Sequence, residues 1–199
     1  MTVHNRISTL SLLVVGTLLC GLGTATGSEP VTEIPKSQSP NCSLALFVVA
    51  GSTNSAEKLA LMSVPDNTVL AELTLSNAVS QIRRLPFTKT SIAWKHDSTC
   101  VAISFSDRTR SYIFACVAVK DGRCKWIDLN VVEGPNLGVL GRDRKDLLRV
   151  EHTPTHWTDA DDWSPRMVWV RSRFWDKKGQ RYTVEQEFSI SPTGEVGWK

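Results

Sequence analysis

The feature that most constrains this chain is a pattern of short apolar segments, separated by turn residues, that occurs three times. The gaps between the segments are rich in Gly, Pro, Asn, Asp and Ser, which is typical of antiparallel strands joined by tight turns. The expected strands are 44–50, 58–64 and 69–75 in the first copy, 92–94, 100–105, 112–119 and 124–129 in the second, and 156–157, 167–175 and 182–190 in the third. The pattern therefore predicts an all-β fold built from antiparallel meander repeats.

Turn residues stand at matching places in the three copies. Asn41, Asp97 and Pro165 precede the long hairpin of each copy, and a second turn closes each hairpin at a similar interval. Repeated meanders of short strands are typical of propeller blades and related repeat sheets, in which each unit buries its apolar face against a neighbour. An ordinary β-sandwich, in which hairpins recur without internal repetition, is the alternative.

The middle copy, IAWKHDSTCVAISFSDRTRSYIFACVAVKDGR, resembles the WD-like β-propeller repeat of TolB-type proteins. The residues that carry the resemblance are Trp94, Asp97, Val101, Ile103, Arg108, Tyr112 and Asp121-Gly122. Weaker copies begin at Ser39-Pro40-Asn41 and around Trp157 and Trp163. The resemblance implies a partial or short β-propeller-like array over 41–199 that serves as a binding scaffold. Closed propellers have about 4–8 blades, so three copies leave open an arc, a partial barrel or an assembly completed by a partner.

The first 40 residues have a different character from the repeats. A short basic start precedes an uncharged apolar run, 7–22, and small residues follow at 25–27, which predicts a signal peptide over 1–27. The run is shorter than the roughly 20 residues that a bilayer span requires, so we expect no stable membrane span after cleavage. Residues 28–40 are polar and Pro-rich, and we expect them to be a tether. These features predict a secreted or periplasmic protein.

The charge balance and the missing motifs narrow the function. The chain has 23 basic and 20 acidic side chains, which argues against a dedicated nucleic-acid binder. It contains no GxSxG elbow, HExxH pair, phosphate-binding Gly loop or CxxC motif. We therefore expect no cofactor and a non-enzymatic module that binds a protein partner or an envelope component. The alternative is a carbohydrate-binding or carbohydrate-active protein that uses the C-terminal Trp residues.

The candidate ligand-binding residues lie in the third copy. They are Trp169, Arg171, Arg173 and Trp175, which alternate with Val168, Val170, Ser172 and Phe174 along one expected strand. An exposed stripe of Trp and Arg binds sugars or polyanions through apolar contact and cation–π attraction. In the competing interpretation the Trp side chains pack between sheets and the Arg side chains form ion pairs with glutamates.

A hairpin register for this copy follows from its apolar residues. Pairing Phe174 with Val184 and Val170 with Phe188 places the apolar side chains on one face. The same register sets Arg171 opposite Glu187 and Arg173 opposite Glu185.

Two histidines and three aspartates form a second cluster, within HTPTHWTDADD. These residues are His152, His156, Asp159, Asp161 and Asp162. Nitrogen and oxygen ligands of this kind bind zinc or calcium. On the expected strand, however, His152 and His156 would be about 13 Å apart on one face, so we expect a polar turn and no metal. The preceding segment, 141–152, carries four basic residues and is compatible with a short helix.

Four cysteines remain after cleavage of the expected signal peptide: Cys42, Cys100, Cys116 and Cys124. A two-residue turn at 121–122 pairs Val119 with Cys124 and Cys116 with Ile127. This register places Cys100 and Cys124 on one face of the sheet, about 10 Å apart, with Cys116 on the other. A disulfide requires Cα atoms within about 7 Å. We therefore expect at least two of the four thiols to be unpaired.

Overall fold

The computed structural model describes residues 30–51, 56–119, 123–130, 144–158 and 166–198. These residues form three four-stranded antiparallel sheets, here called sheets A, B and C. Sheet A contains β1 (Val31–Glu33), β2 (Leu44–Val49), β3 (Lys58–Ser63) and β4 (Thr68–Thr74). Sheet B contains β5 (Lys89–Trp94), β6 (Cys100–Ser106), β7 (Ser111–Ala118) and β8 (Cys124–Asp128). Sheet C contains β9 (Leu147–Thr158), β10 (Arg166–Asp176), β11 (Arg181–Ile190) and β12 (Val196–Trp198).

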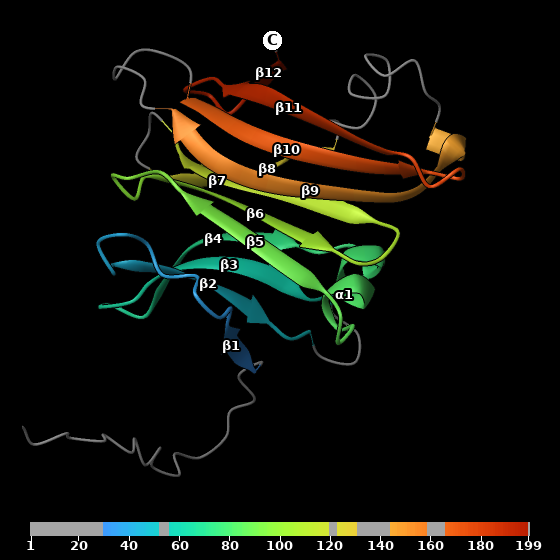
Figure 1. Ribbon diagram of the computed structural model, residues 1–199. Coiled ribbons are helices and arrows are strands. Elements are labelled where there is room, and N and C mark those ends of the chain that lie inside the picture. The colour runs from blue at the N-terminus through green and yellow to red at the C-terminus, as the bar shows by residue number, and fades with distance from the viewer. Residues whose placement is uncertain (1–29, 52–55, 120–122, 131–143, 159–165, 199) are drawn as a thin grey trace, which may run out of the picture.

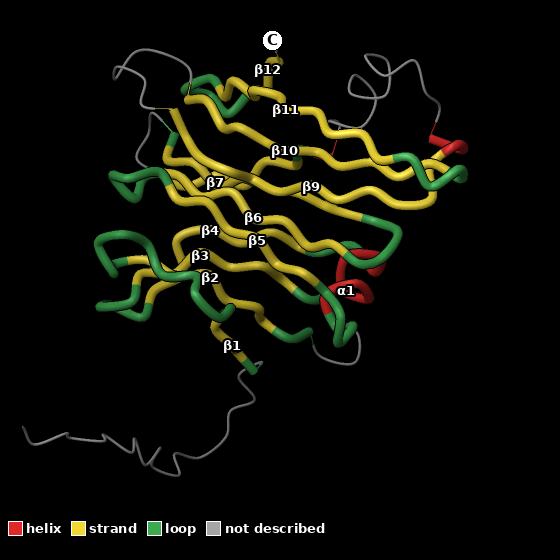
Figure 2. Tube along the Cα trace, viewed as in Figure 1, coloured by secondary structure: helices red, strands yellow, loops and turns green. Residues whose placement is uncertain are grey.

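In every sheet each strand pairs with its neighbours along the chain, so each sheet is a simple meander. The sheets stack face to face in chain order, with sheet B between sheets A and C (Figure 1). Strands make up most of the regular structure (Figure 2). The predicted all-β fold of antiparallel meander repeats is confirmed, and within the described residues the three sheets form a stack rather than a closed ring.

Two apolar cores hold the stack together, one on each face of sheet B. The core against sheet A joins Leu46, Leu59 and Leu61 to Val101, Ile103, Phe105 and Phe114, with Trp94 packed at its margin. The core against sheet C joins Ala102, Ile113, Ala115 and Val117 to Val168, Val170, Phe188 and Ile190. All seven residues of β6 are buried, because both faces of this strand are covered.

Between sheets A and B the chain forms α1 (Asn77–Arg83), a short helix that the strand pattern does not predict. Ser76 caps it by accepting a hydrogen bond from the backbone N–H of Val79. Val79 and Ile82 lie on one side of the helix and are buried in the core between sheets A and B. The apolar residues of 75–85 thus follow a helical rather than an alternating period.

The ends of two sheets differ from the sequence-based expectation. Residues 28–40 are not a simple tether, because Val31–Glu33 form β1 and pair with β2. The described part of the segment that is compatible with a short helix forms a 3₁₀ turn, Arg144–Asp146, and then β9, which begins at Leu147. In both segments the backbone adds an edge strand to a sheet, β1 to sheet A and β9 to sheet C. Pairing with a neighbouring strand decides this outcome, and the local residue preferences do not predict it.

The register of the β10–β11 hairpin differs from the predicted one by two residues. Arg171 lies opposite Glu185, not Glu187, and Phe174 lies opposite Tyr182. The reason is a tighter turn, in which Gly179 adopts a positive φ of 77° and Asp176 accepts hydrogen bonds from the backbone of the turn. A shift of two residues preserves the face of every side chain, so the predicted apolar face is retained.

The β7–β8 hairpin differs from the prediction by one residue, which has a larger effect. The β6–β7 register is the predicted one, with Cys100 opposite Val117. On the next strand, however, Cys116 lies opposite Trp126 rather than Ile127. A shift of one residue moves a whole strand face to the other side. Cys124 therefore shares a face with Cys116 and not with Cys100.

Candidate binding face on sheet C

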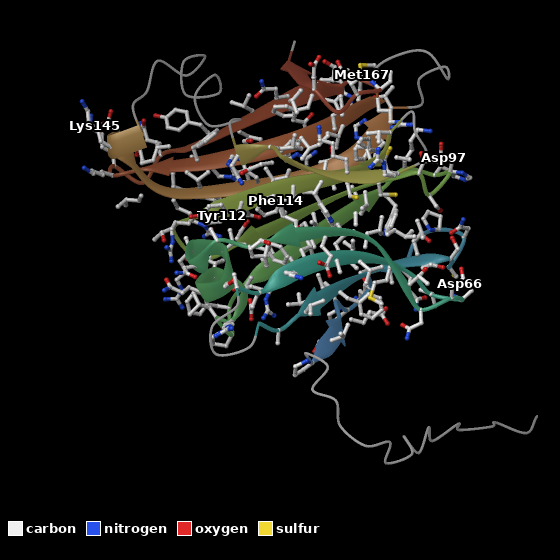
Figure 3. All side chains as sticks on the ribbon, turned by 180° about the vertical axis from the view of Figure 1, so that it is seen from behind. Asp66, Asp97, Tyr112, Phe114, Lys145 and Met167 are labelled. Atoms are coloured by element: carbon white, nitrogen blue, oxygen red, sulfur yellow. The ribbon has the colours of Figure 1, made fainter. Side chains whose placement is uncertain are left out.

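The predicted site residues lie together on the side of sheet C that faces away from sheet B. Val168, Val170 and Phe174 of β10 are completely buried on the inner side. The residues that alternate with them, Trp169, Arg171, Arg173 and Trp175, therefore lie on the opposite side, which we call the sheet C outer face. Figure 3 shows sheet C as an outer layer of the molecule, with Met167 of β10 on one side and Lys145 on the other. All four residues are partly exposed.

At one end of this face, Trp169 stacks on His156 of β9. The two ring centroids are 5.8 Å apart and the ring planes are nearly parallel, at 9°. The indole N–H of Trp169 donates to the hydroxyl oxygen of Thr158 at 3.0 Å, which fixes the orientation of the ring. One face of the Trp169 ring is therefore covered by a neighbouring side chain.

A β-bulge makes this stacking possible. The β9–β10 register shifts between Trp169 and Val170, and Thr155 is the extra residue on β9. Its hydroxyl donates to the carbonyl oxygen of Trp169 at 3.1 Å. Pro154, which has no N–H to donate, stands beside the bulge, where a missing ladder bond is tolerated. Because of the extra residue, His156 points to the outer face.

At the other end, Trp175 lies among cations. The guanidinium of Arg149 is 4.4 Å from the centroid of the Trp175 ring, and that of Arg181 is 5.7 Å from it. Both distances allow cation–π attraction. Arg149 and Arg181 are the residues directly opposite Trp175 on β9 and β11, so the cross-strand register builds this cluster.

The two arginines of the site form ion pairs. Arg171 donates to Glu185 at 2.7 Å in an exposed pair. Arg173 lies 3.4 Å from Glu151, which also accepts from Lys89 at 2.5 Å and from Arg149 at 3.3 Å. Burial by itself would raise the pKa of Glu151, but the three cations outweigh it and hold the pKa below its usual value.

Each of the two interpretations of the Trp and Arg residues is partly supported. Trp157 is buried between sheets B and C, and its indole N–H donates to the carbonyl oxygen of Ala93 at 2.9 Å. Trp169 and Trp175 remain on the outer face, where Arg171 is paired with a glutamate as the competing interpretation requires. Trp163 lies outside the described residues.

The histidine cluster is not assembled by the fold. His152 is buried, and its Nδ1 is 2.9 Å from the hydroxyl oxygen of Ser172. His156 lies on the outer face, so the bulge places the two histidines on opposite sides of β9 and not on one face as predicted. Asp159, Asp161 and Asp162 lie outside the described residues. The described part of the chain contains no group of three His, Cys, Asp or Glu residues that could hold a metal ion.

Sequence reasoning did not find the residues that surround the Trp and Arg side chains. All three belong to β9: Glu151 and Arg149 precede the strand residues that the repeat pattern predicts, and His156 was considered only as a metal ligand on the same face as His152. The alternation of exposed and buried residues is visible in β10, whereas the bulge interrupts it in β9. Without the full length of β9 and its bulge, no pattern in the sequence pairs these residues with their partners.

Two cavities in the described residues are smaller than typical small-molecule sites, which have volumes of about 300–1,000 Å³. One, of about 190 Å³, lies between β1 and Phe105 of sheet B, and the other, of about 220 Å³, lies between Glu57 and α1. The sheet C outer face therefore remains the stronger candidate for a binding surface.

No protein-family model matches the sequence, and no curated protein matches it. Among the described residues, no helix has the length and apolar character needed to cross a membrane.

Proposed function

We propose that the protein is a secreted or periplasmic, non-enzymatic binding module that docks a protein partner on the sheet C outer face. The observation that carries this proposal is the composition of the face. Among the described residues it holds the four arginines Arg149, Arg171, Arg173 and Arg181, together with Trp169 and Trp175. Arg and Trp are the residue types that contribute most to binding energy at protein interfaces.

The charges of the face indicate what the partner presents. Glu151, Glu185 and Glu187 lie opposite Arg173, Arg171 and Trp169 in the strand register. The four arginines exceed these three glutamates, so the described part of the face is mildly basic. A partner surface with exposed carboxylates beside apolar side chains complements it.

A carbohydrate ligand is the alternative, and the Trp geometry is less suited to it. A sugar ring packs on an open face of an aromatic ring. His156 covers one face of Trp169, and the guanidinium groups of Arg149 and Arg181 lie close to the Trp175 ring. A sugar would be limited to the ring faces that these contacts leave open, whereas a protein partner can pack over the whole arrangement.

The TolB-like resemblance and the export signal belong to the same proposal. Consecutive propeller blades are meanders that pack face to face, and sheets A, B and C are arranged in this way. Export is supported by the apolar leader over 1–27. If it is cleaved as we expect, intact-mass measurement of the exported protein gives a chain that begins near residues 26–28. A mass that still includes Met1 would contradict export with cleavage.

Cross-linking in an envelope extract tests the docking surface. Wild-type protein, the double variant Trp169→Ala with Arg171→Glu, and the control variant Leu70→Ala are compared by quantitative mass spectrometry. Leu70 is exposed on β4 of sheet A, far from the candidate face. The proposal predicts one protein that cross-links to wild type and control and is strongly depleted with the double variant.

Two outcomes would contradict the proposal. Equal recovery of every cross-linked protein with the wild type and the double variant would exclude this face as the docking site. Binding on a glycan array that is lost in Trp169→Ala and in Trp175→Ala, without a protein partner, would favour the carbohydrate alternative.

A further inference from the structure

Four segments that are far apart in the sequence meet at one end of the sheet stack, the end that holds α1 (Figure 1). The guanidinium of Arg108 lies 5.0 Å from the centroid of the Phe87 ring, which joins the β6–β7 turn to the segment after α1. The backbone N–H of Lys177 donates to the carbonyl oxygen of Asp146 at 3.1 Å, which joins the β10–β11 turn to the start of β9. An ion pair between β5 and β9 links these two pairs of segments. We call the surface formed by 83–89, 107–110, 145–149 and 176–181 the α1 end.

Basic residues greatly outnumber acidic ones at the α1 end. Its four segments contain ten Lys and Arg residues and three Asp residues. Two further carboxylates lie behind this surface, and each is paired with two of its cations: Glu57 with Arg83 and Arg84, and Glu151 with Lys89 and Arg149. Ten cations against five carboxylates leave a larger positive charge at this end than the +3 of the whole chain. The positive charge of the protein is therefore concentrated here.

The cations of the α1 end lie at the surface of the molecule. The side chains of Arg84 and Lys89 are 64% and 55% exposed, although both have an acidic partner. Figure 3 shows the contrast between the two ends of the stack, with Lys145 at the α1 end and Asp66 and Asp97 at the opposite end. The excess charge can therefore act on a large anionic surface that approaches this end.

Two bulky apolar side chains are exposed among these cations. Phe87 is 48% exposed and Leu148 is 55% exposed. Phe87 lies against the guanidinium of Arg108, so an aromatic ring and a cation are presented together. A lipid bilayer accommodates both kinds of group, because apolar side chains enter the boundary between headgroups and acyl chains while Lys and Arg bind lipid phosphates. A soluble polyanion provides the negative charge without an apolar phase.

We propose that the α1 end binds peripherally to the surface of a bilayer that contains anionic phospholipids. The basic side chains contact lipid phosphates, and Phe87 and Leu148 enter the headgroup region. Arg149 and Arg181 belong both to this end and to the sheet C outer face, whereas Trp169 and Arg171 lie farther along β10. Membrane binding through the α1 end therefore leaves that part of the outer face accessible to a protein partner.

Cosedimentation with lipid vesicles tests the proposal. The exported protein without its leader is mixed with vesicles of phosphatidylcholine alone or of phosphatidylcholine with phosphatidylglycerol. We expect it to sediment with the anionic vesicles at low salt and to stay in solution with the neutral ones. High salt should release it, because added ions screen the attraction between the basic residues and the lipid phosphates.

A matched pair of variants localises the binding. Arg108→Gln with Lys178→Gln removes two exposed positive charges from the α1 end. Arg123→Gln with Lys125→Gln removes two exposed charges at the start of β8, at the other end of sheet B. A basic residue near an anionic membrane contributes about fivefold to binding, so the first variant should bind about 25-fold more weakly. The second should bind almost like wild type.

A third variant, Phe87→Ser, tests the apolar contribution without changing the net charge. We expect it to bind anionic vesicles more weakly than wild type. Thermal denaturation of all three variants, in the absence of lipid, checks that each is folded under the conditions of the binding measurement.

Several results would overturn the proposal. One is wild-type protein that does not sediment with anionic vesicles, and another is an equal loss of binding in the two double variants. Unchanged binding in Phe87→Ser, or binding to dextran sulfate without binding to vesicles, would also contradict it. The measurement uses only purified protein and lipid, so its failure leaves the proposed docking of a protein partner untouched.

Discussion

Three cations converge on the carboxylate of Glu151 at the edge of the candidate face. Lys89 reaches it from sheet B, while Arg149 and Arg173 reach it from sheet C. The Glu151 side chain is only 5% exposed, so its carboxylate is largely removed from water and interacts with these three cations instead. Its ion pairs therefore connect two sheets and orient the arginines of the candidate face.

Replacing Glu151 with Gln keeps the size of the side chain and removes its charge. We expect Glu151→Gln to lower the free energy of unfolding near neutral pH by about 1–3 kcal/mol, a range reduced by the partial exposure of the cations. The pKa of Glu151 lies below its usual value of 4.5. Its stabilisation is therefore present above that pH and is lost as the pH falls through the lowered pKa. Urea unfolding at neutral and acidic pH measures both effects.

The matched control is Glu185→Gln, which removes the exposed partner of Arg171. Exposed ion pairs contribute about 0–1 kcal/mol, so this variant should unfold almost like wild type. Two results would contradict this expectation. One is an equal loss of unfolding free energy in the two variants. The other is a loss in Glu151→Gln that is the same at acidic as at neutral pH.

The thiol of Cys124 should respond to pH differently from an ordinary cysteine. Only the thiolate reacts with iodoacetamide, and the pKa of Cys124 is lowered from 9.0 to about 7. We expect the alkylation rate of Cys124 to reach half its maximum near pH 7. Cys116→Ala removes the thiol that lowers the pKa of Cys124, so the midpoint should move toward higher pH. Rates measured by mass spectrometry of the tryptic dipeptide 124–125 provide the test, and a midpoint near 9 in wild type would refute it.

At the scale of single elements, the turns set the register of the hairpins. In the β10–β11 turn, Gly179 has a φ of 77° and no atom outside its chain neighbours lies within 4 Å of a Cβ placed there. Gly179→Ala therefore isolates backbone strain from steric contact. We expect it to lower the free energy of unfolding by about 1–2 kcal/mol. Lys178→Ala in the same turn is the control, and equal thermal denaturation of both variants would contradict the expectation.

The same turns explain where sequence-based prediction succeeds and fails. The alternation of β10 correctly separates Val168 and Val170 from Trp169 and Arg171, because burial on one face imposes a period of two. It does not determine the partner of Arg171, since any shift by two residues satisfies the same pattern. The actual partner, Glu185, depends on the backbone conformation of the turn at Gly179.

The bulge of β9 limited the prediction in another way. A single extra residue, Thr155, reverses the faces of His152 and His156 relative to a regular strand. Pro154 beside the bulge indicates an irregular or edge strand, but it does not determine which residue is inserted. The Trp and Arg residues of the candidate face were therefore predictable from β10, whereas their partners on β9 were not.

At the scale of the whole molecule, sheet B connects the two outer sheets. Ile103 is fully buried in the core that joins sheets A and B. Ile103→Ala should cost about 2–5 kcal/mol, because the surrounding β-sheets cannot close the space that the side chain leaves. The exposed Leu148→Ala on β9 should cost far less. Chemical denaturation monitored by tryptophan fluorescence measures both, and an unchanged midpoint for Ile103→Ala would place this strand outside the core.

The described chain starts and ends in three-residue edge strands, β1 and β12, at opposite ends of the stack (Figure 1). Tension between residues 30 and 198 would act on these strands first. Each is attached to a single neighbour, so its few backbone hydrogen bonds would break one after another and the strand would peel away at low force. The long β10–β11 pairing and the buried β6 would come under tension only afterwards. Under mechanical stretching, β1 and β12 would thus detach at lower force than the strands between them.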